Sequence, residues 1–137
     1  MLWKYNCLAF ELLLNLLMAQ KDVGNKIPIY KLKTTDEVMK YYDEWGIKNK
    51  YDQDMIDCNY TGPKETVATF IKYAKDKNIK ILDAGCGTGL VGIELKKHDY
   101  LNIDGMDLSK KLLDLVPQGY YQNLDQVDLN KQLKVKN

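Results

Sequence analysis

The stretch Ile81–Gly89 reads ILDAGCGTG, and it decides the fold of this chain. A short apolar run ends near an acid, and a turn with glycine at every second position follows. Glycine adopts positive φ angles easily and lets a ligand approach the backbone without a Cβ in the way. The stretch therefore predicts a strand that turns sharply into a helix over 90–97, whose first N–H groups face the ligand.

From residue 79 onward, strand and helix patterns alternate. Ser109 can cap the second helix, and Pro117 and Gly119 break it. Parallel strands joined by right-handed helical crossovers form half of a Rossmann-like sheet, so we expect an α/β fold. The expected strands cover 79–83, 102–106 and 121–127, and the expected helices cover 90–97 and 109–116.

Helical patterns precede the first strand. Thr34 is followed by two acids, which is typical of a helix start, and Gly46 ends that helix. A second short helix is expected within 48–60, and Pro63 begins a third helix with one apolar face. We therefore expect an N-terminal apolar helix and linker over 1–33, followed by one domain, or its N-terminal part, over 34–137. Within this domain a helical cap covers 34–78 and a β-α-β-α-β unit covers 79–129.

The composition argues against several classes of protein. The 137 residues suffice for one domain with a hydrophobic core, and 20 basic against 19 acidic residues give no evidence for nucleic-acid binding. The three cysteines are scattered and histidine occurs once, so we expect neither a disulfide framework nor a metal site. Cys86, with no base apparent beside it, is interpreted as a small loop residue and not a nucleophile. Free cysteines favour a reducing compartment, so we expect a cytoplasmic protein.

The N-terminal segment 7–19 reads CLAFELLLNLLMA and leaves three interpretations open. As a helix it would measure roughly 20 Å, short of the roughly 30 Å of a bilayer core, so a membrane span is not expected. Lys4, Glu11 and Asn15 share one helical stripe, which favours an amphipathic helix docked on protein, or a non-native extension. A secretory signal within 1–19 and a membrane-surface anchor are the other two interpretations.

The glycine turn fits several nucleotide-like ligands. A phosphate-binding P-loop is excluded, because no lysine stands at the required place after the glycines. Gly87, Gly89 and Gly92 do match the spacing of a dinucleotide fingerprint. Asp83 distinguishes the remaining ligands, since its carboxylate would oppose a pyrophosphate and attract the sulfonium and ammonium groups of S-adenosylmethionine. The charge at the strand end therefore favours the methyl donor.

Two further acids and two leucines extend the candidate site. Asp107 ends the second strand, where a carboxylate can accept hydrogen bonds from both hydroxyls of a ribose. Asp128 lies near the end of the third expected strand, in place to meet the amino group of adenine. Leu108 and Leu129 could sandwich the adenine ring. The plainer alternative is that Asp83 and Asp128 are exposed strand-end acids with no ligand.

These residues carry a resemblance to a known family. ILDAGCGTG resembles motif I of the class I methyltransferases that use S-adenosylmethionine, and IDGMDLS resembles the segment around their second strand. More narrowly, three stretches resemble the methyltransferase-like proteins related to the Williams–Beuren syndrome chromosome region methyltransferase. They are VMKYYDEWGIKNKYDQDM, YTGPKETVATFI and LVGIELKKHDYLNIDGMDLSKKLLD. The similarity covers roughly Thr35 to Leu129.

The resemblance implies roles for the matching positions. Asp107 would hold the ribose of the donor, and Leu108 and Asp128 would hold its adenine. The methionine part of the donor would be surrounded by Asp83, Gly85, Gly87 and Gly89. The aromatic residues of the helical cap would either close over the donor or pack in the ordinary way, and these are Tyr42, Trp45 and Tyr51.

The resemblance also implies a larger sheet than this sequence supplies. Class I methyltransferases resemble a seven-stranded sheet in the order 3-2-1-4-5-7-6, and we expect a fold truncated after the third parallel strand. The first strand would then have an open edge. The acceptor side and any general base would lie outside the sequence, so we name no catalytic residue.

Three functions remain open. The first is an S-adenosylmethionine-dependent methyltransferase, of which the sequence would be the donor-binding half, as a shortened version or a fragment. Its methyl acceptor, a small molecule or a protein, is not identified. The second is a non-catalytic S-adenosylmethionine-binding or interaction module. The third is an NAD-dependent oxidoreductase, which Asp83 disfavours.

Overall fold

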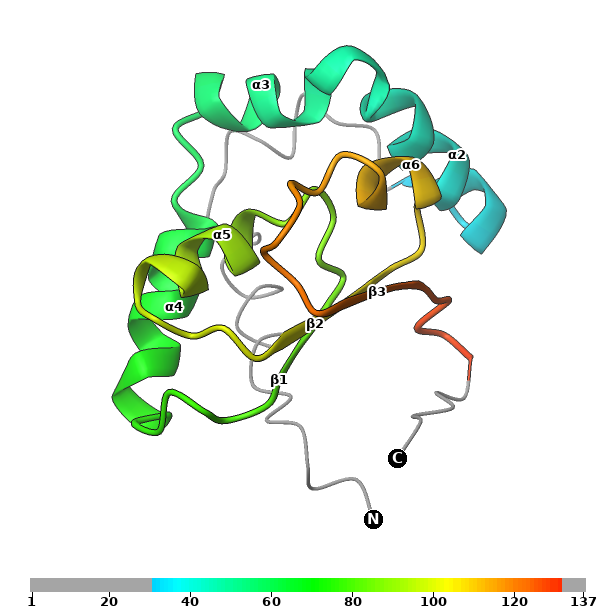
Figure 1. The fold of residues 1–137 in the computed structure, drawn as a ribbon. Coiled ribbons are helices and arrows are strands. Elements are labelled where there is room, and N and C mark those ends of the chain that lie inside the picture. Colours follow the sequence, from blue (N-terminus) through cyan, green and yellow to red (C-terminus); the bar gives the residue numbers. More distant parts are fainter. Residues whose placement is uncertain (1–30, 132–137) are drawn as a thin grey trace.

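The computed structural model describes residues 31–131 of the chain, and Figure 1 shows how the helices and strands are arranged. The apolar segment 7–19 and nearly all of the expected linker lie outside the described residues. No helix within 31–131 is long and apolar enough to cross a membrane. In chain order the elements are α2 (Thr35–Trp45), η2 (Ile47–Asn49), α3 (Lys50–Asp57), α4 (Gly62–Tyr73), β1 (Ile81–Ala84), α5 (Leu90–Lys97), β2 (Ile103–Asp107), α6 (Lys110–Leu113) and β3 (Asn123–Gln126).

Three parallel strands form the sheet of the described chain, in the order β1-β2-β3. The register pairs Asp83 with Gly105 between β1 and β2, and it pairs Asp107 with Gln126 between β2 and β3. Helix α5 connects β1 to β2, and α6 connects β2 to β3. The structure confirms the expected α/β class and is consistent with a partial Rossmann-like fold.

The core lies between the sheet and the helices α4 and α5, which lie side by side in Figure 1. The buried Tyr100 hydroxyl donates a hydrogen bond to the carbonyl of Ala74, at the end of α4. Alternate residues of a strand point to the same face, so the side chain of Asp83 enters the same layer as Ile81. The buried members of the core are Val67, Ile81, Leu95, Tyr100 and Ile103.

Helices α2, α3 and α4 fall within the range 34–78 expected for the helical cap, and from here on the name refers to α2 and α3 alone, because α4 packs in the core. The Thr34 hydroxyl accepts from the Glu37 amide, and the Glu37 carboxylate accepts from the Thr34 amide, which forms a capping box at the start of α2. Gly46 ends α2, as expected. Lys48 and Asn49 have positive φ angles of 55° and 57°, so the chain turns sharply before α3 begins.

Two elements near the end of the described chain are shorter than predicted. Helix α6 ends at Leu113 instead of Val116, and the amides of Leu115 and Val116 bond to carbonyls three residues back. Pro117 explains part of this difference, because the residue before a proline avoids helical backbone. Strand β3 covers only Asn123–Gln126, so Tyr121 lies on the segment before the strand and not within it.

Candidate functional site

The glycine turn joins β1 to α5 at the carboxyl end of the sheet. Its glycines adopt the left-handed region, with φ angles of +80° at Gly85, +55° at Gly87 and +88° at Gly89. The amides of Gly85 and Cys86 donate to the carbonyl of Met106 at 2.7 and 2.9 Å, which fixes the turn to β2. The predicted sequence of strand, turn and helix is confirmed, with glycines in conformations that other residues rarely adopt.

The turn has an open half and a packed half. A Cβ on Gly85 would meet no atom within 4 Å, and one on Gly87 would meet a single side-chain atom at 4.0 Å. A Cβ on Gly89, in contrast, would lie 3.1 Å from both Tyr121 and Val116. A ligand can therefore approach the backbone of Gly85 and Gly87, whereas Gly89 makes room for side chains of the protein itself.

Asp107 lies at the end of β2, directly beside the turn. Its Oδ2 accepts from the Gly87 amide at 2.8 Å, and its Oδ1 accepts from the Ser109 amide at 2.8 Å. Burial raises the pKa of Asp107 above its usual value, although the backbone amides of Ser109, Gly87 and Leu108 act to lower it. Each carboxylate oxygen keeps a further lone pair for a ligand hydroxyl. The structure brings Asp107 and the glycine turn together, and the ribose contact itself stays a prediction.

Asp83 is buried at the end of β1, with 5% of its surface exposed. Its Oδ2 accepts from the Tyr121 hydroxyl at 2.7 Å. Burial raises the pKa of Asp83 to about 6, the Tyr121 hydrogen bond lowers it, and the charge of Asp107 raises it. The plainer alternative of an exposed strand-end acid is therefore wrong for Asp83, because the residue is buried. The contact of Asp83 with a methyl donor stays a prediction.

Cys86 lies in the centre of the turn and is buried. Burial raises the pKa of its thiol, and the charges of Asp83 and Asp107 raise it further. A protonated and inaccessible thiol is a poor nucleophile, in agreement with its interpretation as a small loop residue. Within residues 31–131, no group of three or more His, Cys, Asp or Glu side chains could hold a metal ion.

The residues predicted to hold adenine lie further along the chain, after β2 and β3. Asp128 follows the end of β3, where its carboxylate accepts from the Asn130 amide at 3.0 Å and pairs with Lys131 at 3.4 Å. The hydrogen bond from Asn130 is the main cause that lowers the pKa of Asp128. Leu108 and Leu129 are partly exposed. The role of these three residues toward adenine stays a prediction.

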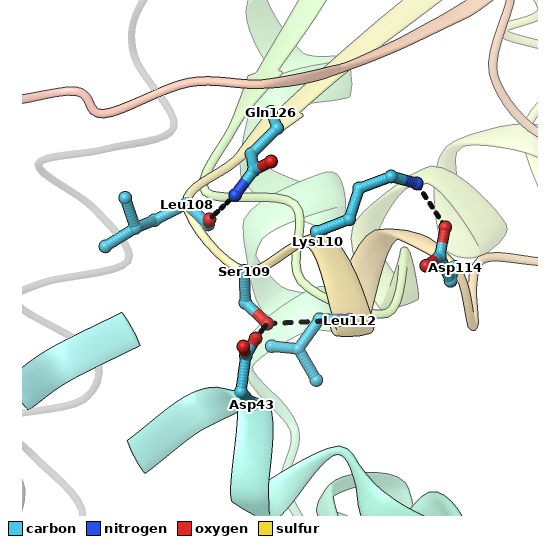
Figure 2. A network of polar contacts seen from close by, with 7 residues as sticks. All are labelled: Asp43, Leu108, Ser109, Lys110, Leu112, Asp114 and Gln126. Atoms are coloured by element: carbon cyan, nitrogen blue, oxygen red, sulfur yellow. Dashed lines mark hydrogen bonds and ion pairs between the residues drawn. The ribbon is translucent and has the colours of Figure 1, made fainter. Parts of the chain in front are cut away.

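Gln126 occupies the position of β3 that faces the end of β2. It pairs in register with Asp107, and its side-chain amide donates to the carbonyl of Leu108 at 2.9 Å, as Figure 2 shows. A polar side chain absent from the sequence prediction therefore lies beside the expected ribose contact. Gln126 can be recognised as a site residue only from the register of β2 and β3, and local sequence patterns do not determine this register.

Two hydroxyl–carboxylate contacts fix the helical cap to the carboxyl end of the sheet. The Thr88 hydroxyl donates to Asp52 of α3 at 2.6 Å. The Ser109 hydroxyl donates to Asp43 of α2, and it also accepts from the Leu112 amide at the start of α6 (Figure 2). Neither Asp43 nor Asp52 is identifiable from the sequence, because acids on amphipathic helices are usually solvated.

The aromatic residues of the helical cap pack against one another. Trp45 is 9% exposed, and its indole N–H donates to Asp54 at 2.7 Å. Its ring centroid lies 4.8 Å from that of Tyr51 and 6.0 Å from that of Tyr42. Packing therefore accounts for Trp45. Burial is the main cause that raises the pKa of Tyr51, and the neighbouring Tyr42, Tyr60 and Asp52 contribute more to this rise than Asp107 does.

The chain is similar to a human protein. It is 32% identical over 97 residues to Methyltransferase-like protein 27 of Homo sapiens, and the aligned region covers 69% of this chain and 39% of that protein. The chain therefore spans well under two thirds of the length of this relative. No protein-family model and no solved structure matches the chain. The identity shows distant homology to a methyltransferase-like protein.

Proposed function

We propose that the chain binds S-adenosylmethionine and forms the donor-binding part of a class I methyltransferase. The observation that carries the proposal is the hydrogen bond of 2.8 Å from the Gly87 amide to Asp107. It joins a glycine turn with accessible backbone to an acid at the neighbouring strand end, which is where nucleosides bind in open α/β sheets. The homology to Methyltransferase-like protein 27 supports S-adenosylmethionine as the nucleoside.

The charges beside the turn support a cationic ligand. Asp83 and Asp107 both act electrostatically on Cys86 in the middle of the turn. With its pKa raised to about 6, Asp83 is mostly ionised at neutral pH. The two carboxylates would repel a pyrophosphate, whereas they would attract a sulfonium and an ammonium group. This arrangement favours S-adenosylmethionine over NAD.

Each part of the site has a separate task in this proposal. The backbone of Gly85 and Gly87 admits the methionine end of the donor, and Asp83 provides the negative charge for it. Asp107 accepts hydrogen bonds from the ribose while it stays bonded to the turn, and Gln126 lies on the side expected for adenine. When bound, S-adenosylmethionine supplies an electrophilic methyl group on its sulfonium. The chain's own residues hold and orient the donor, and we assign no catalytic base.

Methyl transfer is the further part of the proposal. Much of its rate would come from holding the donor in line with an acceptor, which is worth roughly 7–11 kcal/mol in favourable cases. The assigned groups from β1, β2 and β3 all act on the donor side. A non-catalytic donor-binding module is therefore the second candidate function, since it requires only these groups.

Isothermal titration calorimetry of the full chain tests donor binding. We expect saturable binding of S-adenosylmethionine and S-adenosylhomocysteine and no response to NAD. Binding of NAD in preference to both sulfur compounds, or no binding of either, would overturn the proposal.

A transfer assay then separates the enzyme from the module. The chain is incubated with S-adenosylmethionine that carries a radioactive methyl group and with pools of small molecules and proteins. Label in an acceptor supports the methyltransferase. Donor binding without label in any pool favours the module.

A further inference from the structure

Tyr121 packs against three glycines from different parts of the fold. A Cβ on Gly92 would lie 2.3 Å from the phenol ring, one on Gly105 would lie 2.9 Å from it, and one on Gly89 would lie 3.1 Å from it. These glycines belong to α5, to β2 and to the turn that precedes α5. The ring therefore fills the space that the missing side chains leave, and the backbone on three sides fixes its position.

The hydroxyl of Tyr121 has a partner on each side. It accepts from the Gly92 amide at 3.0 Å and donates to Oδ2 of Asp83 at 2.7 Å. Gly92 lies in the first turn of α5, whose N-cap Gly89 has no side-chain hydrogen bond to offer. The phenol therefore pairs one of the amides that the start of a helix leaves unpaired. The two hydrogen bonds therefore connect the N-terminus of α5, where the helix dipole is positive, to the carboxylate of Asp83.

We propose that Tyr121 is a positioning residue for donor binding: its hydroxyl holds the Asp83 carboxylate ionised and oriented for the cationic end of S-adenosylmethionine. The inference rests on the proposed function, because it concerns the same site and ligand. Tyr121 acts through Asp83 and has no assigned contact with the donor. The two hydrogen bonds of the phenol polarise one another, which strengthens the donation to the carboxylate.

Asp83 needs this partner because its other surroundings oppose its charge. Burial is the largest cause that raises the pKa of Asp83, and the charge of Asp107 at the end of β2 adds to it. Cys86 of the turn also faces Asp83, and its thiol is neutral because its own pKa is raised. The Gly92 amide of α5 acts on the carboxylate through the phenol. Among these groups, only Tyr121 favours the charged form directly.

Tyr121→Phe tests the inference, since it removes the hydroxyl and keeps the ring that the glycines surround. Loss of a hydrogen bond to a charged group should raise the pKa of Asp83 by about one to two pH units. The affinity for S-adenosylmethionine should then fall about twofold to tenfold at pH 7 and return toward that of the wild type at pH 8.5. Calorimetry between pH 5.5 and 8.5 measures this profile.

Tyr120→Phe is the matched control. The neighbouring tyrosine has its ring 4.7 Å from the Nζ of Lys96 and is not among the causes that shift the pKa of Asp83, so its variant should keep the pH profile of the wild type. An affinity that falls by the same factor at every pH in Tyr121→Phe would indicate a structural role only. That result would overturn the inference, as would an unchanged affinity.

A double variant tests whether Tyr121 acts through the carboxylate. Asp83→Asn alone should weaken donor binding, and adding Tyr121→Phe should weaken it little further, because the charge that the phenol supports is already absent. Additive losses from the two substitutions would overturn the inference.

Carbon NMR supplies a readout that needs no donor. In the wild type, the Cζ resonance of Tyr121 should shift with the ionisation of Asp83, and a resonance insensitive to pH between 4 and 8 would overturn the inference. In Tyr121→Phe, the carboxyl resonance of Asp83 should titrate at higher pH than in the wild type. If the wild type binds no S-adenosylmethionine, the proposed function fails, and these titrations still decide whether Tyr121 holds Asp83 ionised.

Discussion

Thr88 of the glycine turn donates its hydroxyl proton to Asp52 of α3 at 2.6 Å. Thr88 is 2% exposed, so water does not readily replace this contact. The neighbouring Gly87 donates its amide to Asp107. Consecutive residues of the turn therefore bond to the helical cap on one side and to β2 on the other. The position of α3 is coupled to the part of the turn that we assign to the donor.

Thr88→Val should destabilise the folded chain by about 1–3 kcal/mol, because the shape is kept while Asp52 loses its donor. Urea unfolding followed by circular dichroism measures the change. Thr88→Ser is the control, since it keeps the hydroxyl and should lose less stability. Equal unfolding midpoints for the two variants would show that the contact contributes nothing to stability.

Asp83→Asn should stabilise the folded chain at neutral pH although it weakens donor binding. The pKa of Asp83 rises from 3.8 to about 6 on folding, chiefly through burial. Between these values the folded state binds more protons than the unfolded state, so the stability of the wild type falls as the pH rises from about 4 to about 6. Above about pH 6, burial of the ionised carboxylate lowers the free energy of unfolding by the full amount, on the order of 2–3 kcal/mol.

The variant has no such ionisation, and its side-chain oxygen still accepts from Tyr121. Its free energy of unfolding should therefore exceed that of the wild type by on the order of 1–3 kcal/mol at pH 7.5. The difference should disappear near pH 4. Urea titrations of both proteins at the two pH values measure it, and an advantage that does not depend on pH would contradict the burial of an ionised Asp83.

Gly92→Ala should destabilise the chain, contrary to the usual preference of a helix. Within a helix, Ala is normally favoured over Gly by roughly 1 kcal/mol. At this position the added Cβ would lie 2.3 Å from both Cζ and the hydroxyl oxygen of Tyr121, which Asp83 holds from the other side. We expect a loss of about 1–3 kcal/mol in thermal or urea unfolding.

The cause of this loss can be isolated with a second background. In a Tyr121→Leu chain the smaller side chain leaves room for the Cβ, so Gly92→Ala should be neutral or stabilising there. The same cost in both backgrounds would mean that the glycine is needed for a reason other than the tyrosine. The spacing of Gly87, Gly89 and Gly92 matches a dinucleotide fingerprint, and the packing of Tyr121 against Gly92 explains the last of these glycines without a ligand.

Helices and strands that begin or end at a distinctive residue pattern can be predicted from the sequence. Thr34 and the acids that follow it predict the start of α2, and the glycine turn predicts the junction of β1 and α5. The lengths of the short elements α6 and β3 are predicted less well. Every residue of β3 is exposed, so no apolar alternation marks its ends, and its pairing with β2 determines its length.

The candidate site also has a part that the sequence predicts and a part that it does not. The acids Asp83 and Asp107 are predictable, because each follows a short apolar strand beside a turn. Their surroundings are not, since Tyr121 lies 38 residues from Asp83 and contacts it only through the fold. A window of local sequence cannot show a pair at that separation. For this reason the sequence leaves an exposed acid as the plain alternative for Asp83, whereas the structure shows a buried one.

Asp107→Ala should weaken the binding of S-adenosylmethionine by about 1.5–3 kcal/mol, provided that Asp107 is ionised and both ribose hydrogen bonds form. This corresponds to roughly a tenfold to 150-fold loss of affinity. Calorimetry at pH 8 is appropriate, because burial raises the pKa of Asp107 and the carboxylate must be charged. Asp107→Asn keeps one acceptor oxygen and should give an intermediate loss.

Asp104→Ala is the matched control for this prediction. Asp104 lies on the same strand, where it pairs with Lys80 at 3.1 Å, and its loss should leave donor affinity unchanged. Asp107 also holds the amides of Gly87 and Ser109, so its variant should unfold at lower urea concentration whether or not it contacts ribose. Stability alone therefore cannot decide its role. Reduced stability with the same affinity as Asp104→Ala would mean that Asp107 only anchors the turn, and the ribose assignment would be wrong.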